Sequence, residues 1–235
     1  MTQSPEELLA WQRQVALLEL NGIVTRAFRR LDSDRQRAVV GAVVAEAAAH
    51  GPAGVQVKAV AERSGVAVGS LYQYFPKRDG MVAAAIEVAV GYLSVVLTES
   101  AAYLRAMPLR DGLLAYLGTG VEWSAENADL LRLFARAAYA GDTPHAETVV
   151  RPVAEAMRGC LRALLEGAAE RGELRDDVDL DTAVRFVHVV TAAVGDAQLV
   201  PHLDDYYLLF DADHPVDTVV PQMVDLVVRA IGASS

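Results

Sequence analysis

The sequence predicts an all-α protein with a short helix-turn-helix segment in its first third and a longer helical region after it. Two observations predict this fold class. Apolar residues recur at three- and four-residue steps along most of the chain, and no stretch shows the period-two alternation of strands. Hydrophobic residues make up 53% of the 235 residues, which is enough to bury a substantial core. We expect about ten helices and no internal repeat.

The first expected helix begins at Ser4-Pro5-Glu6-Glu7, where Ser4 and Glu7 have capping-box spacing. Its apolar residues continue at helical spacing to about Leu31. Asp32-Ser33-Asp34 interrupts the pattern, and Ser33 with Gln36 predicts a second capping box. The helix that follows ends at His50, because Gly51-Pro52 stops it.

The segment Val57–Met81 reads as two short helices joined by a tight turn. Val57, Val60 and Ala61 form one apolar face, and Ser64-Gly65 ends the first helix. Gly65 suits a left-handed turn. The second helix, 67–74, buries Leu71 and Phe75.

After Phe75 the chain continues in long apolar-periodic segments. Asp179-Leu180-Asp181 starts one helix with acidic residues at its positive end. A last helix is predicted over Pro215–Ile231. Met81–Thr98 is the longest apolar stretch, but Glu87 near its middle favours a buried core helix over a membrane span.

The formal net charge of −10 argues against a nucleic-acid binder, but the charge is unevenly distributed. Residues 1–82 carry 10 Lys and Arg against 8 Asp and Glu, so they are slightly basic. The remainder has a net charge of −12. The part that approaches an anionic polymer would therefore be the N-terminal one.

Cys160 is the single cysteine, so no intrachain disulfide and no cysteine-based metal cage is expected. The N-terminus has no basic region before an apolar core, so we expect no signal peptide, no membrane partner and a cytoplasmic protein.

The residues Gly69–Phe75 (G-S-L-Y-Q-Y-F), the helix VKAVAERSGV before them and the P-K-R-D after them resemble the TetR family of transcriptional regulators. The resemblance implies an all-α fold with an N-terminal three-helix DNA-binding domain at 33–80 and a C-terminal helical ligand-binding and dimerisation domain at 81–235. Residues 1–32 are then an extra N-terminal helix. Gln56 departs from the Ser or Thr cap common in the family, and Ala67 and Val68 depart from its polar recognition-helix start.

The resemblance implies that the second helix of the motif reads an operator, with phosphate contacts around it. The expected DNA-binding residues are Lys58, Val68, Gly69, Ser70, Tyr72, Gln73, Tyr74, Lys77 and Arg78. We favour phosphate or sugar contact for Tyr72 and Tyr74 and a base-edge contact for Gln73. Ser70 and Lys58 remain open between phosphate contact and simple solvation, and Val68 offers an apolar contact to a thymine methyl.

Arg26, Arg29 and Arg30 cluster at the end of the N-terminal extension. They are either extra phosphate ligands or charges on a helix that packs its apolar face on the effector domain or on a partner subunit. We prefer the packing interpretation, because apolar positions outnumber the charges.

By resemblance, the C-terminal domain binds a small effector and pairs two chains. The candidate ligand-binding residues are Tyr92, Tyr116, Trp123, Asn127, Phe134, Tyr139, Phe186 and His188. The candidate dimer residues, on two helices around 144–171 and 179–200, are Val149, Val153, Met157, Leu161, Leu164, Val187, Val190 and Val194. Each ligand-binding candidate alone is also a plausible core residue.

These features predict a homodimeric repressor on a palindromic double-stranded DNA operator, released by a small, apolar or aromatic effector. A regulator without an inducer, or an activator, is the alternative. We expect no enzymatic activity and no cofactor, because no catalytic motif is present. The acidic loop 196–217, with His202 and His214, is interpreted as solvated in preference to a metal site.

Overall fold

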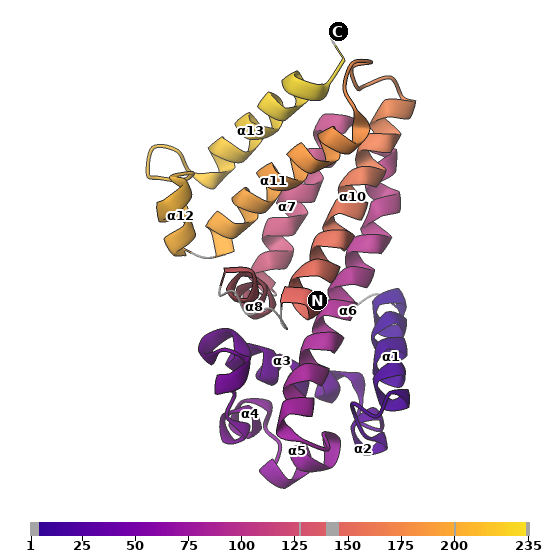
Figure 1. The fold of residues 1–235 in the computed structure, drawn as a ribbon, viewed down its shortest axis with the longest axis vertical. Helices are drawn as coiled ribbons and strands as arrows, with labels where there is room; N and C mark the ends of the chain where they lie inside the picture. The colour runs from indigo at the N-terminus through magenta and orange to yellow at the C-terminus, as the bar shows by residue number, and fades with distance from the viewer. Residues whose placement is uncertain (1–4, 127, 140–145, 200, 234–235) are drawn as a thin grey trace. The chain divides into compact units, whose positions relative to one another are not determined.

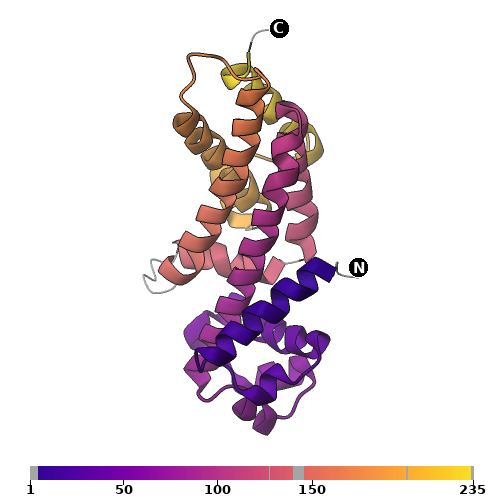
Figure 2. The same cartoon turned by 90° about the vertical axis from the view of Figure 1, so that its right-hand side faces the viewer.

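The computed structural model describes residues 5–126, 128–139, 146–199 and 201–233, and this part of the chain is helical throughout apart from turns and one isolated β-bridge between Leu174 and Gly232 (Figures 1 and 2). The α-helices are α1 (Pro5–Leu20), α2 (Arg26–Arg29), α3 (Ser33–His50), α4 (Val57–Ser64), α5 (Val68–Tyr74), α6 (Arg78–Ala106), α7 (Leu109–Glu126), α8 (Ala128–Tyr139), α10 (Arg151–Glu170), α11 (Leu180–Leu199), α12 (Pro201–Tyr207) and α13 (Val216–Ile231). A 3-10 turn, η1 (Pro52–Gly54), and a π-helical turn, η2 (Ala146–Val150), complete the elements. The all-α prediction is confirmed.

The chain divides into two compact units. The first contains Met1–Val96 and Asp129–Val153, and the second contains Leu97–Ala128 and Ala154–Ser235. The helix-turn-helix segment and the N-terminal extension therefore belong to the same unit. The helices α6 and α10 contribute residues to both units.

The predicted long N-terminal helix is wrong in its second half. Helix α1 ends at Leu20, and Gly22 adopts a positive φ of 70°. Thr25 then caps the short helix α2, because its side chain accepts a hydrogen bond from the Phe28 amide. The prediction failed because Val24 and Phe28 are buried like Trp11 of α1, so the apolar spacing in the sequence runs on past the end of that helix.

The predicted capping box at Ser33 and Gln36 is also wrong. Asp32 is the N-cap of α3, and its carboxylate accepts the Arg35 amide at 2.8 Å. Gln36 is 4% exposed and makes three hydrogen bonds elsewhere. Its Oε1 accepts the Trp11 indole N–H at 3.0 Å, while Nε2 donates to the carbonyls of Phe28 and Arg29 at 3.2 Å each. Gln36 thus joins α1, α2 and α3.

Helices α4 and α5 form the predicted helix-turn-helix; α4 packs against α3, and α5 packs against α4 and α2 (Figure 1). Gly65, at the turn, has the left-handed conformation with φ of 68° that was expected of it. Neither Gln56 before α4 nor Ala67 before α5 makes a side-chain cap. Helix α5 begins at Val68, one residue later than predicted.

The second unit is a helical layer in which α7, α11 and α13 lie against one another (Figure 1). Its core includes Leu113, Leu161, Leu164 and Val187, each at most 1% exposed. Helix α10 approaches the end of α6 closely, because a Cβ built on Gly167 would lie 2.0 Å from the carbonyl oxygen of Arg105. The predicted helix starts at 179–181 and 215 are confirmed, with Asp179 accepting the Thr182 amide at 2.8 Å.

Helix α6 is long and apolar enough to cross a membrane by length and composition alone, and half of its most apolar window is buried within the structure. Such burial is typical of a core helix, which agrees with the interpretation of Met81–Thr98. Among the described residues, no group of three or more His, Cys, Asp or Glu side chains is arranged to hold a metal ion.

Candidate nucleic-acid interface

Helix α5 has one buried side and one exposed side. Leu71 and Phe75 are each 1% exposed and anchor the helix in the core of the first unit. They are four residues apart, so they lie on the same face of the helix. The prediction that both residues are buried is therefore confirmed, and their burial determines which residues of α5 face outward.

The outward side of α5 is small, polar or aromatic and lacks acidic residues. Tyr72 is 55% exposed and Val68 39%, and Gly69 and Gln73 are also exposed. Ser70 and Tyr74 are half-buried. No Asp or Glu occurs between Arg63 and Arg78. A surface of this composition is compatible with the negative potential and the donor and acceptor groups of a major groove.

The basic residues near α5 differ in how far they are engaged. Lys77 is exposed and no ion pair to it is recorded within the described residues. Lys58 lies 3.8 Å from Glu62, although both side chains are largely exposed, so the pair is weak. Arg63 lies 3.6 Å from the buried carboxylate of Glu46.

Arg78 differs from the predicted phosphate ligand in its contacts. Its guanidinium donates to the carbonyl of Ala53 at 2.7 Å and to that of Val55 at 2.9 Å, and it also contacts Asp79. These bonds hold the η1–α4 loop against the start of α6. The structure thus makes Arg78 a positioning residue for the helix-turn-helix.

Sequence reasoning missed two residues that hold the end of α5. The Thr25 amide donates to the Tyr74 carbonyl at 2.9 Å, and the Thr25 hydroxyl donates to the Gln73 carbonyl at 2.6 Å. The Phe28 ring packs 5.2 Å from that of Phe75 and 6.1 Å from that of Tyr74. The one available signal was Asn21-Gly22, a turn dipeptide inside an otherwise helical pattern.

The candidate ligand-binding residues are divided between the two units. Tyr92 makes an edge-on ring contact with Trp11, 6.0 Å away in the first unit, and Phe134 also belongs to that unit. Phe186 is 45% exposed on α11. Asn127, and the side chains of Trp123 and Tyr139, lie outside the described residues.

Tyr116 and His188 share a neighbour in the second unit. Tyr116 hydrogen-bonds Thr191, and burial raises the pKa of the Tyr116 hydroxyl far above its ordinary value. Thr191 donates to the His188 carbonyl at 3.1 Å. Burial, with a smaller effect of Arg158, holds the pKa of His188 below its ordinary value.

Two buried polar atoms of α11 have no hydrogen-bond partner in the part of the chain that the structure describes. They are His188 Nδ1 and Gln198 Nε2. Positions 188, 191 and 198 follow one another at three- and seven-residue steps, so they lie on one side of α11. Unpaired buried polar atoms cost free energy, so such a stripe is a candidate for contact with a bound molecule. Gln198 was not among the predicted residues.

Most candidate dimer residues are already covered by their own chain, which corrects their assignment as a seam. Six of them are at most 2% exposed: Val149, Val153, Leu161, Leu164, Val187 and Val194. A side chain without accessible surface has none left to bury against a partner. Met157 and Val190 are half-buried. The apolar periodicity identified the inner face of α10 and α11, and periodicity alone does not tell that face from an interface.

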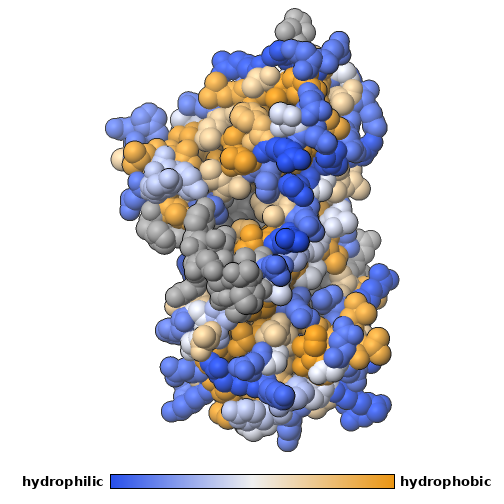
Figure 3. All heavy atoms as spheres, viewed as in Figure 1, coloured by the Kyte–Doolittle hydropathy of each residue, from blue (hydrophilic) through white to orange (hydrophobic). Residues whose placement is uncertain are grey.

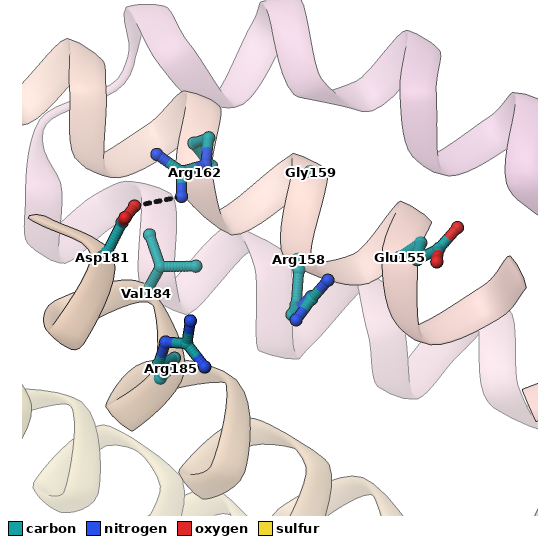
Figure 4. A pocket seen from close by; sticks show the side chains of 7 residues that line it. All are labelled: Glu155, Arg158, Gly159, Arg162, Asp181, Val184 and Arg185. Atoms are coloured by element: carbon teal, nitrogen blue, oxygen red, sulfur yellow. Dashed lines mark hydrogen bonds and ion pairs between the residues drawn. The ribbon is translucent and has the colours of Figure 1, made fainter. Parts of the chain in front are cut away.

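The outer face of α10 and α11 is different in character. Phe186 and Val189 are 45% and 66% exposed on α11. Beside them, a surface concavity between the two helices is lined by Glu155, Arg158, Gly159, Arg162, Asp181, Val184 and Arg185 (Figure 4). Figure 4 shows Arg162 directed at Asp181, whereas Arg158 and Arg185 make no marked contact. Figure 3 shows apolar side chains at the surface of the α11 and α13 region, bordered by hydrophilic ones.

Comparison with known proteins identifies the N-terminal segment. The model for bacterial regulatory proteins of the tetR family matches residues 41–85, which contain most of α3, all of α4 and α5 and the start of α6. A search of the curated proteins found no match for the chain.

Solved structures show the same fold over most of the chain. A TetR family transcriptional regulator from Chloroflexus aurantiacus is 21% identical with a TM-score of 0.56, covering 90% of this chain and 99% of that one. A TetR transcription regulator from Haloarcula marismortui is 18% identical with a TM-score of 0.61, covering 86% and 100%. The regulator FadR from Bacillus subtilis, solved with stearoyl-CoA, is 14% identical with a TM-score of 0.57, covering 82% and 95%.

Proposed function

We propose that this chain, a DNA-binding transcriptional regulator of the TetR family, is a homodimeric repressor that binds a palindromic operator in the cytoplasm and is released by a small molecule. The observation that carries the proposal is the outward side of α5, where Tyr72, Gln73 and Lys77 are exposed and no carboxylate is near in sequence. One such helix makes few base contacts, so twofold pairing supplies the specificity that a single copy lacks.

DNA binding is tested by selecting duplexes from a random library with the full chain. We expect an inverted repeat whose half-sites lie about one helical turn apart, roughly 34–36 Å. Tyr72→Ala should weaken binding to the selected duplex at least tenfold in fluorescence anisotropy. Tyr103→Ala is the matched control, because Tyr103 is 67% exposed on α6 and far along the chain from the motif. No enrichment of any sequence by the unmodified protein would refute the proposed function.

For dimerisation we propose the outer face of α10 and α11 in place of the covered residues. Exposed Phe186 and Val189 supply apolar area, and we expect Glu155 of one copy to pair with Arg158 or Arg185 of the other in a twofold interface. Figure 4 marks an ion pair for Arg162 but none for Arg158 or Arg185 with the other residues drawn, which supports this charge complementarity.

Val189→Asp should convert the dimer to a monomer in sedimentation velocity and remove operator binding with it. Leu226→Asp is the control, because Leu226 is 59% exposed on α13, outside the proposed interface. A dimer that persists in Val189→Asp, or is lost equally in Leu226→Asp, contradicts this interface.

For the effector we propose contact with the polar side of α11 in the second unit. His188 Nδ1 and Gln198 Nε2 are orphaned donors or acceptors, and Tyr116 with Thr191 adds hydroxyl groups among apolar neighbours. Binding sites for small molecules are mostly apolar with a few placed polar groups, which fits this setting. By linkage, an effector releases DNA only if it binds the DNA-free state better than the bound one.

Long-chain acyl-CoA thioesters are a reasonable first set of probes, because FadR of Bacillus subtilis was solved with stearoyl-CoA. Release of the selected duplex by a probe, lost in Gln198→Leu but kept in Gln222→Leu on α13, supports the effector site. Gln222 is exposed, so its substitution serves as the control. Release that is unchanged in Gln198→Leu contradicts this location. If no small molecule releases the duplex, the protein is a regulator without an inducer.

A further inference from the structure

The N-terminal extension is joined to the recognition helix by hydrogen bonds. The last carbonyl groups of a helix have no partner within the helix. In α5, two of these, on Gln73 and Tyr74, accept the hydroxyl and the amide of Thr25. Thr25 also begins α2, so the start of α2 lies against the end of α5.

Apolar packing and Gln36 fix α2 in this place. Phe28 of α2 has no exposed surface, and its ring contacts the Tyr74 ring edge-on and the Phe75 ring at a tilt. At the other end, Gln36 Nε2 donates to the carbonyls of Phe28 and Arg29. Both ends of α2 are therefore held, so its side chains keep a defined position relative to the outward side of α5.

The two arginines of α2, Arg26 and Arg29, and the C-cap Arg30 are not equivalent. Arg29 Nη1 lies 2.6 Å from the Glu19 carboxylate, so its charge is matched. Arg26 and Arg30 are exposed, and no acidic partner of either is recorded among the described residues. They are four residues apart and lie on one side of the turn. Arg26 directly follows Thr25, which touches the backbone of Gln73 and Tyr74.

We propose that α2 is a second DNA-contacting element, in which Arg26 and Arg30 bind backbone phosphates next to the major-groove site of α5. The inference rests on the proposed DNA binding and adds a ligand surface outside the helix-turn-helix. Unpaired guanidinium groups beside a helix that enters a groove are suited to phosphate oxygens, which they bind in a bidentate manner. Such contacts fix register and raise affinity without reading bases.

Residues 1–82 are only weakly basic, so each cation that is free to meet a phosphate matters. Several cations of the motif are engaged within the chain: Arg78 by carbonyls, Arg63 by Glu46 and Lys58 by Glu62. Arg26 and Arg30 add two unengaged positive charges at the edge of the same surface. Arg26 and Arg30 of the N-terminal extension therefore supply phosphate ligands in place of the helix-turn-helix cations that already have partners within the chain.

The test measures affinity for the selected duplex as a function of KCl concentration, using full-length protein. The slope of log affinity against log salt is about −0.9 per phosphate neutralised. On a twofold operator each substitution removes two contacts, so Arg26→Gln and Arg30→Gln should each flatten the slope by about 1.8. Binding should weaken at least fivefold for the selected duplex and for unrelated duplexes alike.

Arg29→Gln is the matched control, because it changes the same charge in the same turn at a residue already paired with Glu19. It should leave the slope nearly unchanged. Arg26→Lys should restore most of the slope, which a merely structural role of Arg26 in α2 would not predict. Circular dichroism and sedimentation verify that each variant is folded and of unchanged oligomeric state.

A double variant, Arg26→Gln with Arg30→Gln, that keeps both the slope and the affinity of the unmodified protein overturns the inference. That outcome is distinct from failure of the proposed function. If the proposed function fails, the unmodified protein selects no duplex. If only this inference fails, the unmodified protein binds a duplex and Tyr72→Ala weakens that binding, but the substitutions at Arg26 and Arg30 leave it unchanged.

Discussion

Replacing Gln36 by alanine should destabilise the first unit strongly, although the residue is polar and lies in the first turn of a helix. Gln36 is 4% exposed, and its amide makes three hydrogen bonds, of which those to Trp11 and Phe28 are buried. Gln36→Ala leaves the indole N–H of Trp11, which is also 4% exposed, and the Arg29 carbonyl without these partners, whereas the Phe28 carbonyl still accepts the Leu31 amide. The substitution also opens a space of about four heavy atoms at the junction of α1, α2 and α3.

The magnitude follows from the number of orphaned groups. An unsatisfied buried polar group costs about 1–3 kcal/mol, and water entering the space recovers a part of that cost. We expect a loss of about 3 kcal/mol in the free energy of unfolding. With a urea m-value of about 1–3 kcal/mol/M, the midpoint for the first unit should fall by at least about 1 M.

Urea unfolding followed by circular dichroism measures the effect. Gln56→Ala is the matched control, because Gln56 is exposed and makes no side-chain cap. Its free energy of unfolding should stay within about 0.5 kcal/mol of that of the unmodified protein, as expected for surface substitutions. If Gln36→Ala behaves like Gln56→Ala, the hydrogen-bonded junction described for Gln36 does not exist and the reasoning fails.

Three further predictions concern the second unit. Gly167→Ala should lower the free energy of unfolding by more than about 2 kcal/mol, because the new Cβ would lie 2.0 Å from the Arg105 carbonyl oxygen. Gly41→Ala is the control: nothing lies within 4 Å of its Cβ, so it should raise the free energy of unfolding by up to about 1 kcal/mol. Thermal unfolding compares the two variants, and equal effects would contradict the close approach at Gly167. His188 has a folded-state pKa below its unfolded value of about 6.5, so its contribution to stability is present above that pH and is lost as pH falls. In His188→Gln the decline in urea midpoint between pH 7.5 and 5.5 should be shallower, and an identical decline would refute the assignment. Burial raises the pKa of the Cys160 thiol to about 11, so alkylation by iodoacetamide at pH 8 should be at least about 100-fold slower in the folded protein than in urea, and comparable rates would exclude a buried thiol.

The helix-turn-helix was predictable because local chemistry decides it. Gly65 permits the turn, and the four-residue spacing of Leu71 and Phe75 fixes the buried side of α5, so the exposed residues follow. The left-handed conformation of Gly65 also depends only on neighbouring backbone, and that expectation is confirmed.

Other features depend on partners distant in sequence and were not predictable. Thr25 bonds residues 48 and 49 positions away, and Gln36 bonds an indole 25 positions away. In the same way, an apolar face at helical spacing reads identically whether its own chain or a second copy covers it. Leu161 and Val187 were assigned to an interface for that reason, and only their burial shows that the chain covers them.

The contacts of Thr25 and Phe28 with the end of α5 have a consequence for protein engineering. The recognisable motif, 41–85, is not a self-sufficient cassette in this protein. A chimaera that transplanted it alone onto another effector domain would leave the Phe75 ring without Phe28 and the end of α5 without Thr25. Such a graft should begin at Pro5, so that the exchangeable module is nearly twice as long as the motif by which it is recognised.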